Sequence, residues 1–188
     1  MNKEPVKRIN FRAYKVLSRA IVSYSDLNTL FQNLSELICR SFEVKGCSIL
    51  LFDDREKQLF RVASYGISQE YLSKGPMPID INDQQLNEGT PIIVKDMQKD
   101  PRVLYPDAAK KEGLGTMLCF PIRHRDATLG VVRVYHSEHL ELDEYDLESF
   151  SLLAMTLGLA IENNGLRNFL EQLKMALGNL PLRMLEGL

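Results

Sequence analysis

Cysteine is the side chain in this sequence best suited to nucleophilic or redox chemistry. Such chemistry requires an exposed thiolate, whose pKa is lowered by a neighbouring cation or a helix amino terminus. Cys39, Cys47 and Cys119 are instead widely spaced among apolar residues, unlike the cysteines of a disulfide framework or a metal motif. We therefore expect three buried free thiols.

Two histidines are the best candidates for metal ligands. His136 and His139 have Glu138 and Glu141 beside them, but all four lie in a polar connector with no residue that would orient the imidazoles. The sequence also has no glycine-rich phosphate loop, serine-centred elbow or pair of carboxylates spaced for catalysis. We expect a solvated loop, no catalytic residue, no metal and no cofactor, and hence a protein that is not an enzyme.

One charged residue, Arg133, interrupts the apolar run 129–135. If the hairpin turns around Arg125, the face of Arg133 also carries Leu129, Val131, Met117 and Cys119. A guanidinium among such neighbours needs a partner or a route to water. The partner is either an anionic ligand or a loop carboxylate such as Asp96 or Asp100, and we favour the carboxylate.

The composition is that of a single globular domain with extensions. Of the 188 residues 45% are apolar, and the formal net charge is -2, with lysine and arginine scattered among aspartate and glutamate. Without a basic stripe we expect no direct nucleic-acid partner. Residues 1–10 lack the apolar core of a signal peptide, and no later segment approaches the roughly 18 apolar residues of a membrane span. We expect a soluble, cytoplasmic protein without a membrane partner.

Helical periodicity marks both ends of the chain. Apolar residues at three- and four-residue steps predict a helix that starts at Phe11 and stops at the break 23–25. A second helix follows, with Ser25 as its cap and Gly46 closing its final turn. A third, long helix begins after the acidic segment 141–144 and continues to residue 180.

Alternation with a period of two marks the strands between these helices. It predicts strands at 47–52, 58–65, 116–122 and 128–135, with a short one at 91–94. The first of them is apolar on both faces, so another layer must cover each side. This pattern indicates a central strand in a three-layer arrangement.

The segment between Gly66 and Gly115 is irregular, with short helical stretches and breakers such as Gly75 and Pro76. Long irregular segments on a regular scaffold often carry function. We expect this one to cover a pocket on the order of a few hundred cubic ångströms, as is typical of small-molecule sites. The candidate lining residues are Leu86, Ile93, Met97, Tyr105, Met117 and Arg133.

The order of these elements and several local motifs resemble a GAF domain over residues 26–166. The motifs are 46–51, 59–66, 87–94 with Asp96 and 100–102, 115–122, 129–132 and 160–164. The resemblance implies an α+β fold of three layers. In that fold a central antiparallel sheet of five or six strands carries terminal helices on one face, and short helices and loops cover a pocket on the other.

Relatives of the family have three kinds of chemistry that can be sought here. Those that bind cyclic nucleotides carry an Asn-Lys pair, and the only such pair here is Asn2-Lys3, outside the domain. Those that attach a bilin use a cysteine in the irregular half, usually followed by histidine, and between Gly66 and Gly115 this chain has neither. A further relative reduces free methionine sulfoxide with cysteines of this domain.

The last predicted helix has two apolar faces. One of them should pack on the domain with Leu147, Phe150, Ala154, Leu157 and Ile161. The other follows alternating four- and three-residue steps, the spacing of a coiled-coil seam, through Leu152, Thr156, Leu159, Asn163, Leu166, Leu170, Leu173, Leu177 and Leu180. Asn163 falls at an a position, where a buried amide can fix the register of a parallel pair.

Two arrangements of this helix are open: packing wholly within one subunit, or pairing with a second copy. We favour the homodimer, because nothing else in the chain is available to cover the helix from Leu166 onward. The expected interface residues are Leu159, Asn163, Leu166, Leu170, Leu173 and Leu177.

These features divide the chain into a helical extension (1–24), a GAF-like domain (25–165) and a coiled-coil-like extension (166–188). We expect a bacterial-type regulator in signal transduction, which binds a small molecule and signals through the helical dimer to a partner protein or a missing effector domain. The alternatives are a ligand-free dimerisation scaffold and, less favoured, a thiol-dependent methionine sulfoxide reductase.

Overall fold

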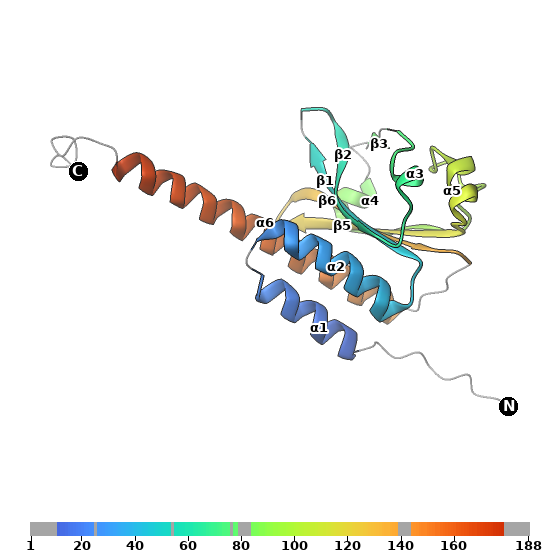
Figure 1. The fold of residues 1–188 in the computed structure, drawn as a ribbon, viewed down its shortest axis with the longest axis horizontal. Coiled ribbons are helices and arrows are strands. Elements are labelled where there is room, and N and C mark those ends of the chain that lie inside the picture. Colours follow the sequence, from blue (N-terminus) through green and yellow to red (C-terminus); the bar gives the residue numbers. More distant parts are fainter. Residues whose placement is uncertain are drawn as a thin grey trace.

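The computed structural model describes residues 11–24, 26–53, 55–75, 77–78, 84–138 and 144–178. Its centre is a six-stranded antiparallel sheet with the strand order β3-β2-β1-β6-β5-β4 (Figure 1). The strands are β1 (Gly46–Asp53), β2 (Gln58–Tyr65), β3 (Met77–Pro78), β4 (Ile92–Val94), β5 (Thr116–His124) and β6 (Ala127–His136). The predicted α+β fold with a sheet of five or six antiparallel strands is confirmed.

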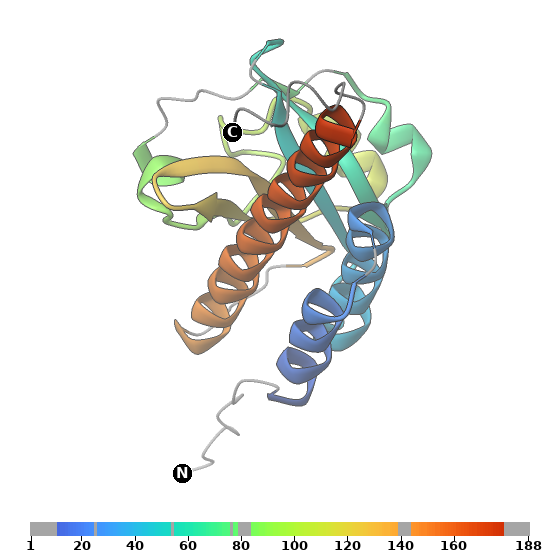
Figure 2. The ribbon, with the colours of Figure 1, turned by 90° about the vertical axis from the view of Figure 1, so that its left-hand side faces the viewer.

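Helices form a layer on each side of this sheet. The long helices α1 (Phe11–Val22), α2 (Leu27–Phe42) and α6 (Glu144–Gly178) lie together on one face, as Figure 2 shows. The short helices α3 (Gln69–Leu72), α4 (Gln84–Glu88) and α5 (Pro106–Glu112) belong to the segments on the other face (Figure 1). The three-layer prediction is therefore confirmed.

The ends of α2 differ from the prediction. Asp26 is the residue that caps the helix, since its side chain accepts a hydrogen bond of 2.8 Å from the backbone N–H of Thr29. The predicted cap, Ser25, lies outside the described residues. At the other end the helix stops at Glu43, which has a left-handed φ of 53°, so Gly46 is free to begin β1.

The main core lies between the sheet and the long helices. Phe120 of β5 stacks on Phe150 of α6 with ring centroids 5.0 Å apart, and Phe42 of α2 lies 4.3 Å from the same ring. Ala154 and Leu157 are buried beside them, which confirms the predicted domain-facing side of the last helix. α6 approaches β5 so closely that a Cβ at Gly158 would lie 2.1 Å from the carbonyl oxygen of Arg123.

The β5–β6 hairpin sets the surroundings of Arg133. Cys119 is directly opposite Arg133, and residues opposite each other in an antiparallel pair share a face. A register shift between Ile122 and Arg123 leaves Leu129 as an extra residue, and its side chain packs against the core under the long helices. The prediction that Leu129 shares the face of Arg133 is wrong, because a bulge cannot be read from alternation alone.

Candidate functional site

A small cavity lies between the sheet and the irregular segment that covers it. Its volume is about 80 Å³, well below the few hundred cubic ångströms expected from the sequence. The floor is formed by Met117 of β5 and Arg133 of β6. The other lining residues are Tyr71, Lys74, Met77, Met97 and residues 102–105.

The structure brings four of the six predicted pocket residues to this cavity: Met97, Tyr105, Met117 and Arg133. Ile93 lies elsewhere, because it pairs with Leu118 and packs with it against the core under the long helices. Leu86 is buried in a separate cluster with Leu50 and Val131. Neither residue therefore lines this cavity.

Six lining residues are not among those predicted: Tyr71, Lys74, Met77, Arg102, Val103 and Leu104. Tyr71 and Lys74 reach the cavity because Ser68 caps the one-turn helix α3 and directs the following chain over the sheet. The pair Gly75-Pro76 signals a turn after this helix but not the direction in which it points. No sequence pattern therefore identifies these residues as pocket-forming.

Arg133 carries the most unusual electrostatics of the cavity. The residue is half-buried as a whole, but its Nε is buried and has no hydrogen-bond partner among the described residues. Its Nη1 donates to the Sδ of Met77 at 3.3 Å, and a thioether is a weak acceptor. The side chains of Tyr135 and Cys119 also interact with the guanidinium. Because a guanidinium stays protonated, the Nε of Arg133 is the buried donor of a charged group that remains unused among the described residues.

The loop carboxylates favoured as partners for Arg133 bind other cations. Asp96 pairs with Lys99 at 3.0 Å, and the carboxylate of Asp100 pairs with Arg102 at 2.6 Å. Arg102 also donates to the carbonyl oxygen of Ile93 at 2.8 Å, so its own charge is well partnered. Neither expected ion pair with Arg133 is present in the described part of the chain.

Lys74 is the second cation in the cavity. Its Nζ donates to the carbonyl oxygen of Tyr71 at 3.2 Å and lies 3.6 Å from the centroid of the Tyr71 ring. Burial lowers the pKa of Lys74 from 10.5 to about 8, with further lowering by the guanidinium groups of Arg133 and Arg61. Glu112 acts in the opposite direction, but its carboxylate accepts hydrogen bonds from Ser68.

The lowered pKa of Lys74 predicts a specific pH dependence of stability. Between pH 8 and 9.5 the unfolded chain holds the Lys74 proton more tightly than the folded chain does, so Lys74 contributes a rise of the free energy of unfolding with pH. The buried thiols of Cys39 and Cys47, whose pKa values are raised, contribute a fall in the same range, and both proteins share it. Lys74→Met should therefore make the pH slope of the free energy of unfolding more negative than in wild type, by less than one proton. Urea denaturation of both proteins at several pH values, at one protein concentration, measures the difference.

The pH window excludes the effect of two other groups near Lys74. Burial raises the pKa of Tyr71 and of Tyr135, so their contribution to stability falls only at still higher pH. Parallel curves for wild type and Lys74→Met would show that water, not the cavity, surrounds the ammonium group.

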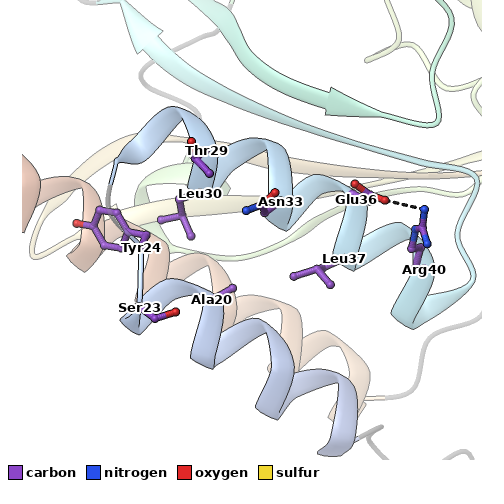
Figure 3. A pocket seen from close by; sticks show the side chains of 9 residues that line it. All are labelled: Ala20, Ser23, Tyr24, Thr29, Leu30, Asn33, Glu36, Leu37 and Arg40. Carbon is purple, nitrogen blue, oxygen red and sulfur yellow. Dashed lines mark ion pairs between the residues drawn. The ribbon is translucent and has the colours of Figure 1, made fainter.

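A larger groove, of about 500 Å³, lies between α1 and α2 (Figure 3). Its charged residues, Glu36 and Arg40, form an ion pair of 2.7 Å with each other. The hydroxyl of Tyr24 donates to the carbonyl oxygen of Ala160 in α6 at 2.8 Å. Because these polar groups have partners, the groove lacks the unsatisfied charge that distinguishes the cavity around Arg133.

The three cysteines are free and buried, as predicted. Burial raises the pKa of the Cys39 thiol to about 12 and that of Cys47 well above its ordinary value. Thiols in this state are poor nucleophiles. The described residues contain no group of three potential metal ligands, and His139 lies outside them.

A family model of the GAF domain matches residues 25–162. The chain therefore belongs to the GAF domain family. No curated protein sequence matches it. None of the helices that the structure describes has the length and apolar character that a membrane span requires.

Solved structures share this fold at low sequence identity. The GAF domain of a phosphoenolpyruvate-protein phosphotransferase from Coxiella burnetii has a TM-score of 0.72 and 16% identity, covering 84% of this chain and 95% of its own. A domain of a putative two-component sensor histidine kinase from Sinorhizobium meliloti gives 0.62 and 18%, covering 74% and 93%. Free methionine-R-sulfoxide reductase from Neisseria meningitidis, in complex with its substrate, gives 0.68 and 16%, covering 86% and 94%.

Proposed function

We propose that this GAF domain is a sensor that binds a small molecule in the Arg133 cavity and signals through a homodimer of its terminal helices. The observation that carries the binding proposal is the buried Nε of Arg133 on the cavity floor, which has no hydrogen-bond partner in the part of the chain that the structure describes. A buried donor without a partner is costly, and a ligand that accepts its hydrogen bond removes that cost. Buried thiols with raised pKa values support a role other than that of an enzyme.

The dimer proposal rests on the exposed apolar face of α6. The helix has 35 residues and extends well beyond the sheet (Figure 1). Leu159, Leu166 and Leu170 are each more than half exposed and Leu173 is 41% exposed. Asn163 lies exposed on the same helix, and the side chain of Leu177 is outside the described set. A large unpartnered apolar stripe with coiled-coil spacing is typical of a helix that pairs with another.

The cavity and α6 are linked through the same two strands. Arg133 lies on β6 opposite Cys119 of β5, and the end of β5 touches α6 at the contact between Arg123 and Gly158. A ligand that shifts β5 or β6 would therefore change the contact on which α6 rests. We propose that the α6 pair transmits this change to a partner protein or an effector domain.

The ligand-free scaffold remains the second candidate, because the cavity of about 80 Å³ is small for a ligand site. A screen of small metabolites by thermal unfolding separates the two. A ligand at a hundred times its dissociation constant stabilises the folded state by about 2.7 kcal/mol. The sensor therefore predicts at least one compound that clearly raises the unfolding temperature.

Two variants locate the binding site in that screen. Met117→Phe adds volume on the cavity floor and should abolish the stabilisation by any active compound. Asn33→Phe places the same side chain in the groove between α1 and α2 and should leave the stabilisation intact. A screen without any active compound would favour the scaffold, and stabilisation that Asn33→Phe removes would place the ligand in the groove.

A further inference from the structure

We infer that the ligand of the Arg133 cavity is a small anion, either a monocarboxylate or an inorganic oxyanion, and this inference rests on the proposed function above. The lining carries the cations Lys74, Arg102 and Arg133, and no carboxylate among the described residues forms part of it. Arg102 is partnered by Asp100 and by a backbone carbonyl. Lys74 and Arg133 are the two charges that remain for a ligand.

The guanidinium of Arg133 is suited to oxygen ligands of one negative charge. Its planar N–H groups match two oxygens of a carboxylate or an oxyanion, and such charge-assisted bonds are the strong ones. The sulfur of Met77 is the acceptor that its Nη1 now faces, and its Nε has none among the described residues. A bound anion would offer charged oxygens to both nitrogens, in place of the weak acceptor at Nη1 and the missing acceptor at Nε.

Lys74 supports the same conclusion by a separate route. Its ammonium group is repelled by Arg133 and by Arg61, whose Nη1 donates to the carbonyl oxygen of Leu72 at 3.0 Å. The acid within electrostatic range, Glu112, is held by the backbone N–H and hydroxyl of Ser68. An anion between Lys74 and Arg133 would turn this repulsion into two attractions.

The size of the cavity restricts the anion. The cavity volume of about 80 Å³ is far below the roughly 300–1,000 Å³ that is typical of sites for larger ligands. Met97 and Met117 add apolar surface beside the two cations. Acetate, nitrate and phosphate are of suitable size, whereas a nucleotide or a haem would require the cover to open.

Isothermal titration calorimetry with matched probes tests the inference. Acetate, propionate, nitrate and phosphate are compared with acetamide and propionamide, the neutral counterparts of the two acids, at constant ionic strength. At least one anion should bind, and both amides should not. Carboxylates that bind while nitrate and phosphate do not would assign an organic acid, and the reverse would assign an inorganic oxyanion.

Variants of the full chain assign the binding to the two cations. Arg133→Met should weaken the anion at least tenfold and keep the fold by circular dichroism, because methionine replaces a partly unpaired charge with an apolar chain of similar shape. Arg40→Met removes one positive charge from the opposite side of the sheet and should bind as the wild type does.

In wild type the affinity for the anion should fall from pH 8 to 9.5 as Lys74 loses its proton, and Lys74→Met should abolish this fall.

The outcomes separate this inference from the proposed function. If the amides bind as well as the acids, or if Arg133→Met leaves anion binding unchanged, the inference is overturned while a small-molecule sensor stands. If the anions fail but a neutral compound is active in the thermal screen, the inference is overturned in the same way. If no probe and no screened compound binds, both are overturned in favour of the scaffold.

Discussion

Replacing Leu170 and Leu173 together by alanine should convert the proposed dimer into a folded monomer. Both leucines are exposed in the single chain and lie beyond the part of α6 that packs on the sheet. Truncating a buried leucine costs about 2–5 kcal/mol per site, and the dimer contains each site twice. We expect the dissociation constant to rise by at least about a thousandfold, since each 1.4 kcal/mol is a factor of ten.

Light scattering and circular dichroism together measure this outcome. Asn168→Ala with Gln172→Ala changes two exposed residues of the same helix outside the seam and should leave the dimer intact. A dimeric double-leucine variant would show that the seam is misassigned. Unfolding of that variant would place the two leucines in the domain core.

Gly158→Ala should lower the free energy of unfolding, although alanine favours helix formation over glycine. The new Cβ would lie 2.1 Å from the carbonyl oxygen and 2.7 Å from the carbonyl carbon of Arg123, and both are backbone atoms of β5. α6 would have to move away from the sheet on which Phe150 and Leu157 pack. Overpacking of this kind costs about 1–3 kcal/mol and occasionally more.

Gly165→Ala is the matched control on the same helix. Apart from the adjacent residues and the backbone of the helix itself, no described atom lies within 4 Å of a Cβ at that position, so the variant should gain about 1 kcal/mol from helix propensity alone. Urea denaturation at one protein concentration compares the two. Equal stabilities for Gly158→Ala and Gly165→Ala would contradict the close packing of α6 on β5.

Much of the fold could be predicted because its signal is local periodicity. Side chains that face the core must be apolar, and they recur with the period of the element that carries them. This produces the three- and four-residue apolar steps of α2 and α6 and the alternation in β1, β2 and β5. The face on which Leu129 lies cannot be predicted in this way, because a bulge changes the phase of a strand without changing its composition. The side on which Ile93 lies is not predictable from sequence for a related reason, since β4 has three residues and its phase is set by pairing with β5.

The candidate site could be predicted only in part. Arg133 stands out in sequence because a charge in an apolar run needs a partner. The residues that surround Arg133 cannot be read from the sequence, because they depend on how the loops fold. Asp96 pairs with Lys99 and Asp100 pairs with Arg102, so neither carboxylate pairs with Arg133. Tyr71 and Lys74 come from a segment whose direction is fixed by tertiary contacts such as the hydrogen bonds that Ser68 donates to the carboxylate of Glu112.

Native mass spectrometry of the protein as purified tests the central proposal, a small-molecule sensor built as a dimer, most directly. The predicted spectrum shows the mass of two chains, with an additional small mass that is lost when the protein is denatured or when Arg133→Met is measured instead. After exhaustive dialysis the additional mass should return when the anion with the highest affinity in calorimetry is added. A single-chain mass at micromolar concentration would contradict the dimer, and a dimer that takes up no small molecule under either condition would contradict the sensor.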